Sequence, residues 1–558
     1  MVMDMHPKKA IPVLIVGGGP VGLSLACDLG WRGVECLLIE RGDGTIEQPK
    51  TNEVNIRTME FCRRWGIVDS IEARGYPRDH PHDQVYCTSL TGYQLSRHPI
   101  PPLGEQQPPP TSSQKKERCP QTVFDPILAE HAARLPNVTM RYRCQFESFV
   151  HTPEGVDCVL TDRDTGATER VFARYVAACD GGNSRIRDAL GIRPQGIDVL
   201  THSTNVLFHA DLQPIHDKGR AVRFLFIEPG GNWANLMCIN GKDLWRLQIL
   251  GDERPWEEQG LDVHASICRA IGREFRDYEV HSIQRWLRRA VVADRYRDGR
   301  IFLVGDSAHQ LTPTGGFGMN TGIGDAVDLS WKLQAMLDGW GGDKLLESYE
   351  AERRPIGQRN VQEATDNFYQ QRKTTSHNGL LDDTSEGART REQVGERFRR
   401  AMFKIWENDG VQLGYYYENS PVCVPDGTPP PADDPVTYHP TARPGSRAPH
   451  AWLSDGRSLL DLFGRGFVLL RFGSEAPEAE ALVEAARRRG VPLDVVLIAD
   501  AAVARLYERK LVLVRPDGHV AWRADVMPAS AIDLIDRVRG AETAEKSNEQ
   551  RQREFAGD

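Results

Sequence analysis

The chain lacks the features that would assign it to a secreted, membrane or nucleic-acid-binding class. Its 11 cysteines are dispersed, with no CxxC pair, so neither a disulfide framework nor a metal site is predicted. The net charge of −9 provides no general attraction to nucleic acid or to an anionic membrane. No apolar run is long enough to span a bilayer, and the N-terminal segment lacks the apolar stretch of a signal peptide. The length of 558 residues is enough for two to four domains. The dispersed cysteines and the lack of a signal segment predict a cytoplasmic enzyme.

A glycine-rich turn near the start predicts a dinucleotide-binding unit. The apolar run at residues 11–16 is typical of a buried parallel strand, and Gly17, Gly19 and Gly22 follow it as GxGxxG. These glycines permit a tight turn, close approach of a pyrophosphate, and close packing of a helix on the strand. Glu40 ends the next strand, where a carboxylate accepts hydrogen bonds from ribose hydroxyls. This motif alone does not distinguish FAD from NAD.

Two later segments also place an acid directly after an apolar strand. In "YVAACDGGNSRIRDALGI", Asp180 and Gly181 follow the strand. In "FLVGDSAHQLTPTGGFGMNTG", Asp306 follows the strand at residues 301–304, and glycines precede a helix that starts near Asn320. Ligands of open α/β sheets bind at the carboxyl ends of the strands, so both segments are expected at one binding edge. The chain contains no second complete GxGxxG fingerprint for a nicotinamide cofactor.

Taken in order, the three segments resemble the fingerprints of the single-component FAD-dependent aromatic hydroxylases, the family of p-hydroxybenzoate hydroxylase and phenol hydroxylase. The resemblance covers about residues 10–370 and includes "LLESYEAERRP" after the third segment. It implies FAD as cofactor, NADPH or NADH as co-substrate, O2 as oxidant and a homodimer. The implied reaction is hydroxylation of a phenolic ring by a flavin C4a-hydroperoxide, without a protein nucleophile or a metal.

The resemblance assigns particular residues to the cofactor. The first segment is expected to hold the ADP half of FAD, and the third segment to lie along the flavin ring. The predicted FAD contacts are Gly17, Gly18, Gly19, Pro20, Val21, Gly22, Glu40, Arg41, Arg57, Gln121, Asp180, Gly181, Asp306, Gly316, Gly318, Met319 and Asn320.

Catalytic residues are harder to select. His309 is a candidate base, with a local structural role as the alternative, and Pro313 is a candidate for fixing the loop beside the flavin through its restricted φ. Asp328 stands where asparagine is common in the family and is expected to affect only helix packing.

The segments between the second and third fingerprints predict an antiparallel sheet that covers the flavin. "TNVLFHADL", "VRFLFIEP", "WANLMCI" and "LWRLQIL" have the composition of strands, and "INGKDL" is a hairpin signal. The candidate substrate-lining residues are Phe224, Phe226, Trp233, Met237 and Trp245, with ordinary core packing as the alternative. His80, His82 and Asp83 are close in sequence, but a solvated loop is a better interpretation than a metal site.

The C-terminal third predicts a separate α/β unit. "GFVLLRFG", "LDVVLIAD" and "KLVLVRPDGHVAWRAD" are predicted strands, and "APEAEALVEAARRRG" is a predicted helix. This unit resembles the thioredoxin-like C-terminal domain of the phenol hydroxylase branch. No cysteine lies beyond Cys423, so the unit is not expected to perform disulfide chemistry.

The expected fold is therefore α/β: a Rossmann-type FAD-binding domain with an inserted antiparallel substrate sheet, followed by a thioredoxin-like α/β domain. The predicted boundaries are 1–80, 119–190 and 285–375 for the FAD-binding domain, 81–118 and 191–284 for the substrate sheet, 376–440 for a helical segment and linker, 441–540 for the thioredoxin-like domain, and 541–558 for a disordered tail.

Several functions stay open at this point. The favoured one is hydroxylation of a small phenol. The alternatives are hydroxylation of a polycyclic aromatic polyketide or a drug, a non-oxygenating flavoprotein of the same fold, and a non-enzymatic module. A halogenase is disfavoured because the WxWxIP signature of that branch is absent.

Overall fold

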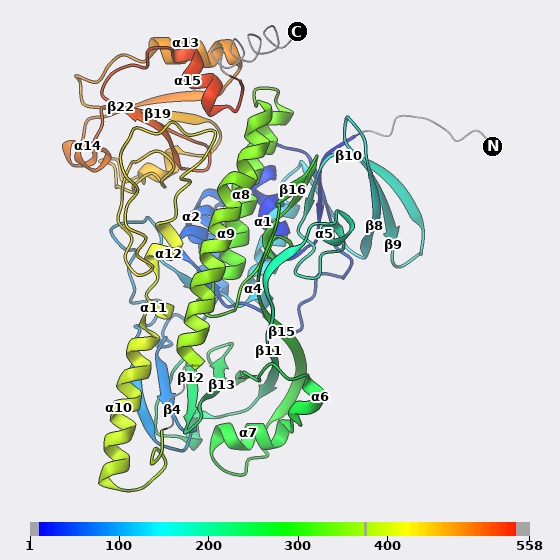
Figure 1. The fold of residues 1–558 in the computed structure, drawn as a ribbon, viewed down its shortest axis with the longest axis vertical. Helices are drawn as coiled ribbons and strands as arrows, with labels where there is room; N and C mark the ends of the chain where they lie inside the picture. Colours follow the sequence, from blue (N-terminus) through cyan, green and yellow to red (C-terminus); the bar gives the residue numbers. More distant parts are fainter. Residues whose placement is uncertain (1–9, 373–376, 543–558) are drawn as a thin grey trace, which may run out of the picture.

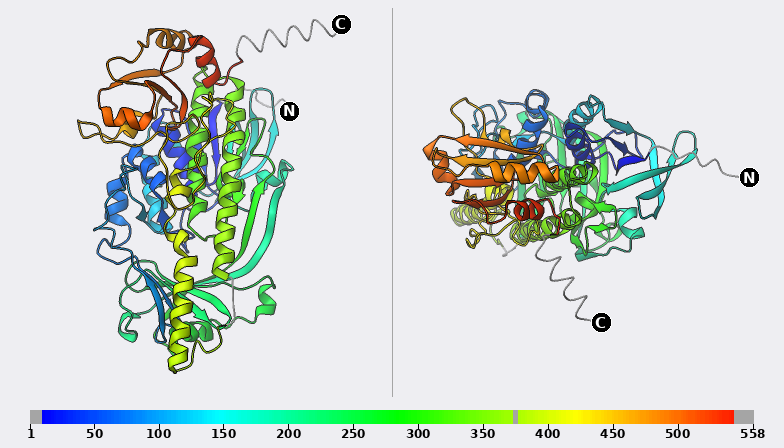
Figure 2. Two further views of the ribbon diagram at one scale, coloured as in Figure 1. Left: turned by 60° about the vertical axis from the view of Figure 1, so that its left-hand side comes forward. Right: turned by 90° about the horizontal axis from the view of Figure 1, so that it is seen from above.

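A computed structural model describes residues 10–372 and 377–542 of the chain. Three sheets lie along the long axis of the molecule. The sheet that contains the first strand is central, a second large sheet lies at one end, and a small C-terminal sheet lies at the other (Figures 1 and 2). The predicted tail at 541–558 falls almost entirely outside the described residues.

The central sheet is built on parallel strands whose apolar side chains are buried. Its main order is β16-β17-β10-β1-β2-β7, with β8 and β9 extending from β10. Strand β1 pairs in parallel with both β2 and β10, which brings the carboxyl ends of these strands to one edge. The strands are β1 (Ile11–Val16), β2 (Cys36–Ile39), β7 (Val138–Arg141), β8 (Cys144–His151), β9 (Val156–Asp162), β10 (Thr168–Ala178), β16 (Arg297–Asp298) and β17 (Ile301–Leu303).

Helices cover the central sheet, and α1 and α8 are buried along almost their whole length. Helix α1 packs against both α4 and α8, and α8 packs against the long helix α9. The helices associated with this sheet are α1 (Pro20–Trp31), α2 (Ile56–Trp65), α3 (Val68–Arg74), α4 (Gln121–Ala133), α5 (Arg185–Ala189), α8 (Phe317–Leu337) and α9 (Asp343–Arg372), with the short η2 (Gly305–Ser307). A two-stranded sheet, β3 (Glu53–Val54) with β6 (Glu117–Arg118), lies beside them.

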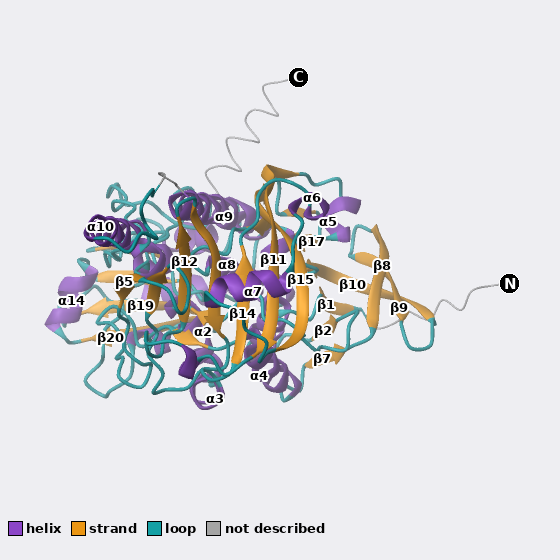
Figure 3. Cartoon of the chain, turned by 90° about the horizontal axis from the view of Figure 1, so that it is seen from below, coloured by secondary structure: helices purple, strands orange, loops and turns teal. Residues whose placement is uncertain are grey.

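The second sheet has the order β18-β15-β11-β14-β13-β12-β4-β5 and confirms the predicted strands and the hairpin at Gly241. Helix α7 lies across its outer face (Figure 3). Its strands are β4 (Gln84–Cys87), β5 (Gln94–His98), β11 (Pro194–His209), β12 (Arg223–Glu228), β13 (Gly231–Cys238), β14 (Leu244–Ile249), β15 (Glu279–Ala293) and β18 (His309–Gln310). The shorter elements are η1 (Gln213–Ile215), α6 (Trp256–Gln259) and α7 (Val263–Ile271).

The C-terminal sheet has the order β20-β19-β21-β22, with the predicted helix in place as α13. Its elements are η3 (Leu459–Leu462), β19 (Phe467–Phe472), α13 (Glu480–Arg489), β20 (Leu493–Ile498), α14 (Ala501–Tyr507), β21 (Leu511–Val514), β22 (Val520–Ala524) and α15 (Ala531–Val538). The preceding helices are α10 (Ser385–Ala401), α11 (Phe403–Trp406) and α12 (Asp409–Leu413).

Two further observations concern membrane-spanning helices and the segment around His80. Among the described helices, none combines the length and the apolar character needed to cross a bilayer. The predicted solvated loop at His80 and His82 is wrong, because both side chains are buried and meet the edge of the Tyr76 ring.

Candidate active site

The glycine turn between β1 and α1 has the shape of a phosphate cradle. Gly17 adopts φ +115°, and a Cβ there would collide with the Cys179 carbonyl at the end of β10. A Cβ at Gly22 would collide with the Gly17 carbonyl, whereas Gly19 has no atom within 4 Å of that position. The start of α1 is therefore open at Gly19, with Pro20 as its first residue. An open helix start with free N–H groups fits a pyrophosphate.

Glu40 follows β2 and faces this turn. Its carboxylate accepts hydrogen bonds from the backbone N–H groups of Gly18 and Gly42, each at 2.7 Å. These bonds fix the carboxylate beside the cradle, where it retains acceptor capacity for a ribose. Arg41 is exposed, while Val21 packs against Gly305.

Asp180 and Gly181 follow β10 at the same edge. Asp180 Oδ1 is buried without a hydrogen-bond partner, and burial raises the pKa of this carboxyl group. Gly181 adopts φ +82° with open space around its Cβ position. An orphaned buried acceptor next to open space fits a ligand that brings a donor.

Asp306 is exposed after β17, whereas His309 is buried, with 1% exposure. His309 Nε2 lies 2.7 Å from Asp325 Oδ2, and Arg353 Nε donates to Asp325 Oδ1 at 2.7 Å. Burial acts to raise the pKa of Asp325, but the charges of Arg353 and His309 hold it below its ordinary value. His309 therefore joins β18 to α8 through Asp325, which Arg353 in turn joins to α9. These contacts favour the structural role, and the candidacy of His309 as a base stays a prediction. Pro313 is exposed.

The loop before α8 has two glycines in the left-handed region, Gly315 at φ +110° and Gly316 at φ +71°. Gly318 has no atom within 4 Å of its Cβ position, so the start of α8 is open. Asn320 does not project into this space: its side chain accepts from Asn55 N and Thr58 Oγ1 and donates to the Glu53 and Gly316 carbonyls. Met319 is buried in the core. Asn320 thus fixes the glycine loop against residues 53–58.

Gln121 fixes the segment around Lys50 in the way that Asn320 fixes the glycine loop. Its Oε1 accepts from Lys50 N at 3.0 Å, and its Nε2 donates to Asp125 Oδ2. Residues 48–54 therefore lie between α4, the glycine loop and the second sheet. Gln48 reaches that sheet through a 2.8 Å bond to Ser282 Oγ.

The second sheet turns different residues toward segment 48–54 than the sequence predicted. Phe224, Phe226 and Trp245 lie in the core between this sheet and α7, and Trp233 packs against the same core. These four side chains do not line the face that is turned toward segment 48–54, because successive side chains of a strand alternate between the two faces of a sheet. Among the five candidates, only Met237 faces segment 48–54, where its sulfur accepts from Asn52 Nδ2 at 3.2 Å.

Three arginines surround Met237 on this inner face and form what we call the arginine cluster: Arg118, Arg223 and Arg246. Arg223, Met237 and Arg246 are paired across β12, β13 and β14. Arg118 Nη2 and Arg246 Nη2 point at the Met237 sulfur, at 3.0 and 3.6 Å. Among the described residues, no carboxylate forms an ion pair with any of the three; Glu53 acts on Arg118 and Arg223 only at longer range.

The electrostatic state of the arginine cluster follows from this lack of counter-charge. Burial, then repulsion from Arg118 and Arg246, lowers the pKa of Arg223 to about 9. Burial, then the charge of Arg118, lowers the pKa of Arg246 to about 10. The Nε of each arginine is buried without a partner. The sequence places Arg223 and Arg246 on strands where either could meet a phenolate or carboxylate, although a surface or satisfied role is the expectation for each. It gives no signal that Arg118 joins them.

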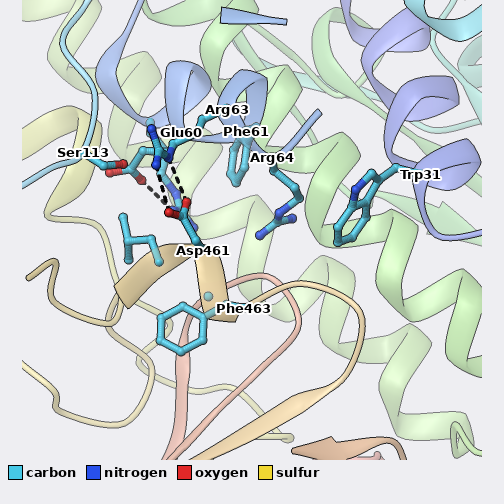
Figure 4. A pocket seen from close by; sticks show the side chains of 11 residues that line it. Trp31, Glu60, Phe61, Arg63, Arg64, Ser113, Asp461 and Phe463 are labelled. Carbon is cyan, nitrogen blue, oxygen red and sulfur yellow. Dashed lines mark hydrogen bonds and ion pairs between the residues drawn. The ribbon is translucent and has the colours of Figure 1, made fainter. Parts of the chain in front are cut away.

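Arg57 lies near the start of α2, where it lines a small pocket with Phe317 and Asn320 of the glycine loop, and its contact with FAD stays a prediction. Its guanidinium donates to Glu60 Oε2 and to the Asp517 carbonyl of the C-terminal domain, both at 2.8 Å. It lines a cavity of about 250 Å³ between α2 and the C-terminal domain, with aromatic walls that include Phe61 and Phe463 (Figure 4). This cavity is separate from the glycine segments.

Comparison with known proteins agrees with this geometry. Residues 10–364 match the FAD binding domain family, and residues 441–541 match the aromatic-ring hydroxylase C-terminal family. The chain is 33% identical to the tetracenomycin B2 monooxygenase-dioxygenase of Streptomyces olivaceus, over 95% of this chain and 98% of that protein. It is also 33% identical to the 4-methyl-5-nitrocatechol 5-monooxygenase of a Burkholderia species, over 96% and 98%.

A solved structure is similar along nearly the whole chain. The structure of RebC soaked with chromopyrrolic acid, with bound 7-carboxy-K252c, superposes with a TM-score of 0.89 at 40% identity, covering 95% of this chain and 99% of RebC. The family matches thus span both the cofactor edge and the C-terminal sheet. The chain belongs to the FAD-binding aromatic-ring hydroxylases and is an FAD-dependent aromatic-ring monooxygenase.

Proposed function

We propose that this monooxygenase hydroxylates a ring of a polycyclic aromatic acid and that the arginine cluster binds the acid group of the substrate. The observation that carries the proposal is the convergence of Arg118 and Arg246 on the sulfur of Met237. We further propose NADH or NADPH as reductant, O2 as oxidant and a homodimer. The cytoplasmic location stays a prediction.

The cluster has the charge of an anion site. A thioether is a weak acceptor, so the Nη2 groups of Arg118 and Arg246 that point at Met237 are poorly satisfied, although Arg246 Nη1 also donates to the Pro49 carbonyl. A buried cation without a counter-charge carries a large desolvation cost. A substrate carboxylate would supply both the missing charge and the stronger acceptor, because charge-assisted hydrogen bonds are about twice as strong as neutral ones.

The arginine cluster is also connected, through segment 48–54, to the glycine loop at Gly316. Asn52, which donates to Met237, is one residue from Glu53, and the Glu53 carbonyl accepts from Asn320 beside the Gly316 loop. A rigid aromatic acid bound at the cluster would extend along segment 48–54 toward that loop. Proximity and alignment of this kind are what hydroxylation requires of the protein.

The cofactor would lie along the glycine segments. We assign the ADP half to Gly17–Gly22 with Glu40, and the flavin side to Asp180, Asp306 and the loop at residues 315–320. When bound, FAD supplies the oxygen-transfer chemistry. The protein residues hold the ring near the loop, bind the carboxylate and exclude water.

The named relatives include enzymes for large natural products and enzymes for small phenols, so they do not decide the size of the substrate. The arginine cluster favours a substrate that carries a carboxylate. The name of the RebC ligand, 7-carboxy-K252c, includes a carboxyl group, and the tetracenomycin relative is also named for a natural product. The nitrocatechol relative and the 2,4-dichlorophenol 6-monooxygenase of Delftia acidovorans are named for small phenols. A small neutral phenol would leave the arginines without a counter-charge.

The experiment is a substrate comparison with the FAD-loaded enzyme under oxygen-18 dioxygen. Chromopyrrolic acid, its dimethyl ester and 2,4-dichlorophenol are tested for stimulation of NADH and NADPH oxidation and for labelled product. The proposal expects the free acid to bind more tightly than its ester and to stimulate oxidation with label incorporated. Equal response to acid and ester, or preference for dichlorophenol, contradicts the proposed substrate class but not the family.

A further inference from the structure

A cluster of metal-ligating side chains lies on the outer face of the second sheet, far from the arginine cluster. His264 and Cys268 are one turn apart on α7, and Glu274 follows on the next loop. Helix α7 buries Ile267 and Ile271 against the sheet, so the three polar side chains lie toward solvent. Their ligand atoms lie within 4.8 Å of one another.

The distances between the ligand atoms match the edges of a zinc tetrahedron. His264 Nε2 lies 3.6 Å from Cys268 Sγ and 3.2 Å from Glu274 Oε1, and Cys268 Sγ lies 3.7 Å from Glu274 Oε2. Zinc bonds of about 2.0–2.1 Å to nitrogen or oxygen and about 2.3 Å to sulfur place neighbouring ligands about 3.3–3.6 Å apart in a tetrahedron. Because His264 and Cys268 meet different oxygens of Glu274, a small rotation of this exposed carboxylate would complete the spacing for one ion.

A second group fixes the orientation of the histidine. His264 Nδ1 lies 2.7 Å from the Tyr278 hydroxyl, and the two rings are stacked at 6.0 Å. A hydrogen bond from Nδ1–H to the hydroxyl oxygen leaves Nε2 free to bind a metal, which is the usual arrangement around zinc-binding histidines. Arg276 competes, because its Nε lies 2.9 Å from Glu274 Oε1, but both side chains are exposed and such pairs contribute little.

We propose that His264, Cys268 and Glu274 bind a zinc ion that joins α7 to the loop before β15. Imidazole, thiolate and carboxylate are all zinc ligands, and the fourth position faces solvent. Binding displaces the thiol proton to solvent. The ion stabilises the outer layer of the substrate sheet and takes no part in hydroxylation. Sequence spacing did not predict it, since the third ligand is on a loop and no CxxC pair is present.

The test measures zinc retained by the full-length, FAD-loaded protein after exchange into metal-free buffer. Wild type is expected to retain about one zinc ion per chain, and C268S and H264Q to retain none. Y278F is expected to lose about 10–100-fold in zinc affinity, because it removes only the group that orients the histidine. His281→Gln and Glu279→Gln are matched controls on exposed residues outside the cluster.

Cobalt(II) provides a direct signature of the coordination sphere. In wild type, Co2+ is expected to give the visible d–d bands of a tetrahedral site, at longer wavelength than the absorption of oxidised flavin, and C268S is expected to lose them. Flavin content and circular dichroism confirm that the variants are folded. Absence of retained zinc in wild type, or equal retention by wild type, C268S and H264Q, overturns the proposal.

Discussion

Arg515, which directly follows β21, forms a buried ion pair with Glu352 of α9, with 2.6 Å between Nη1 and Oε1. Its Nη2 also lies 3.2 Å from Asp328 Oδ1 of α8, and Lys332 Nζ lies 2.6 Å from both Asp328 and Glu352. Asp328 thus does more than affect helix packing. These charges join the C-terminal domain to the helix whose first turn carries the glycine loop.

Arg515→Met is expected to destabilise the protein strongly, because it removes the arginine partner of the buried carboxylates of Glu352 and Asp517 and leaves Glu352 with Lys332. Loss of one partner of a buried ion pair costs about 3–5 kcal/mol. Denaturant unfolding measures this change in the free energy of unfolding. Arg509→Met, which removes a half-exposed pair with Asp525, is the control and is expected to cost less than about 1 kcal/mol. Equal effects of the two substitutions would contradict the assignment.

Acid is expected to weaken the contact between α2 and the C-terminal domain. Burial acts to raise the pKa of Glu60, but the charges of Arg447 and Arg57 lower it from 4.5 to about 2. This carboxylate therefore contributes stability that is complete above pH 4.5 and is lost as the pH falls toward 2, about 3 kcal/mol in all. Unfolding measured against pH should show this component in wild type and not in Glu60→Gln. An identical acid dependence in the two proteins would show that Glu60 is not the group responsible.

Alanine substitutions at Gly17 and Gly19 are expected to affect different properties: the first lowers the stability of the apoprotein, and the second lowers the affinity for FAD. Gly17→Ala forces a positive φ on alanine and a collision with the Cys179 carbonyl, so it should destabilise the apoprotein by more than about 1 kcal/mol. Gly19→Ala has room for its methyl group and should change apoprotein stability by less than about 0.5 kcal/mol. The same methyl group would occupy the space assigned to the pyrophosphate, so the Kd for FAD should rise at least about tenfold. Normal FAD affinity in Gly19→Ala would refute this placement.

His309→Gln distinguishes a structural histidine from a catalytic one. Glutamine can still donate to Asp325, so kcat should fall by less than about tenfold, well short of the 10²–10⁴-fold contribution of a general base. Stability should fall by about 1–3 kcal/mol through the weakened buried hydrogen bond. The readout is the pH profile of kcat, which should keep its shape. Loss of one limb of that profile would favour the catalytic role of His309.

Local patterns predicted the strands and turns well, because apolar alternation and glycine turns are short-range signals. The hairpin at Gly241 and the strand–turn–helix unit at Gly17 are examples. The face that each strand turns toward the cofactor was not predictable in the same way. Alternation separates Phe224 and Trp245 from Met237, but only the packing of α7 decides which set lies in the core.

Long-range partners account for the other differences. Arg57 is predicted as a cofactor residue from its place in α2, and its guanidinium also donates to the Asp517 carbonyl, 460 residues away in sequence. The arginine cluster likewise combines Arg118 with two arginines of β12 and β14, which pairing of distant strands brings together. No sequence window contains such a set.

The central claim is that the arginine cluster binds a substrate carboxylate. It is tested most directly by removing one charge from the protein, removing the charges from the substrate, and comparing the two effects. The quantity is kcat/KM of wild type and Arg246→Gln for chromopyrrolic acid and for its dimethyl ester; if turnover is too slow, the Kd from flavin absorbance replaces it. We expect Arg246→Gln to lose about 10–100-fold with the acid, as for a charged hydrogen bond, and to change little with the ester. Equal losses with acid and ester would show that Arg246 does not bind the carboxylate.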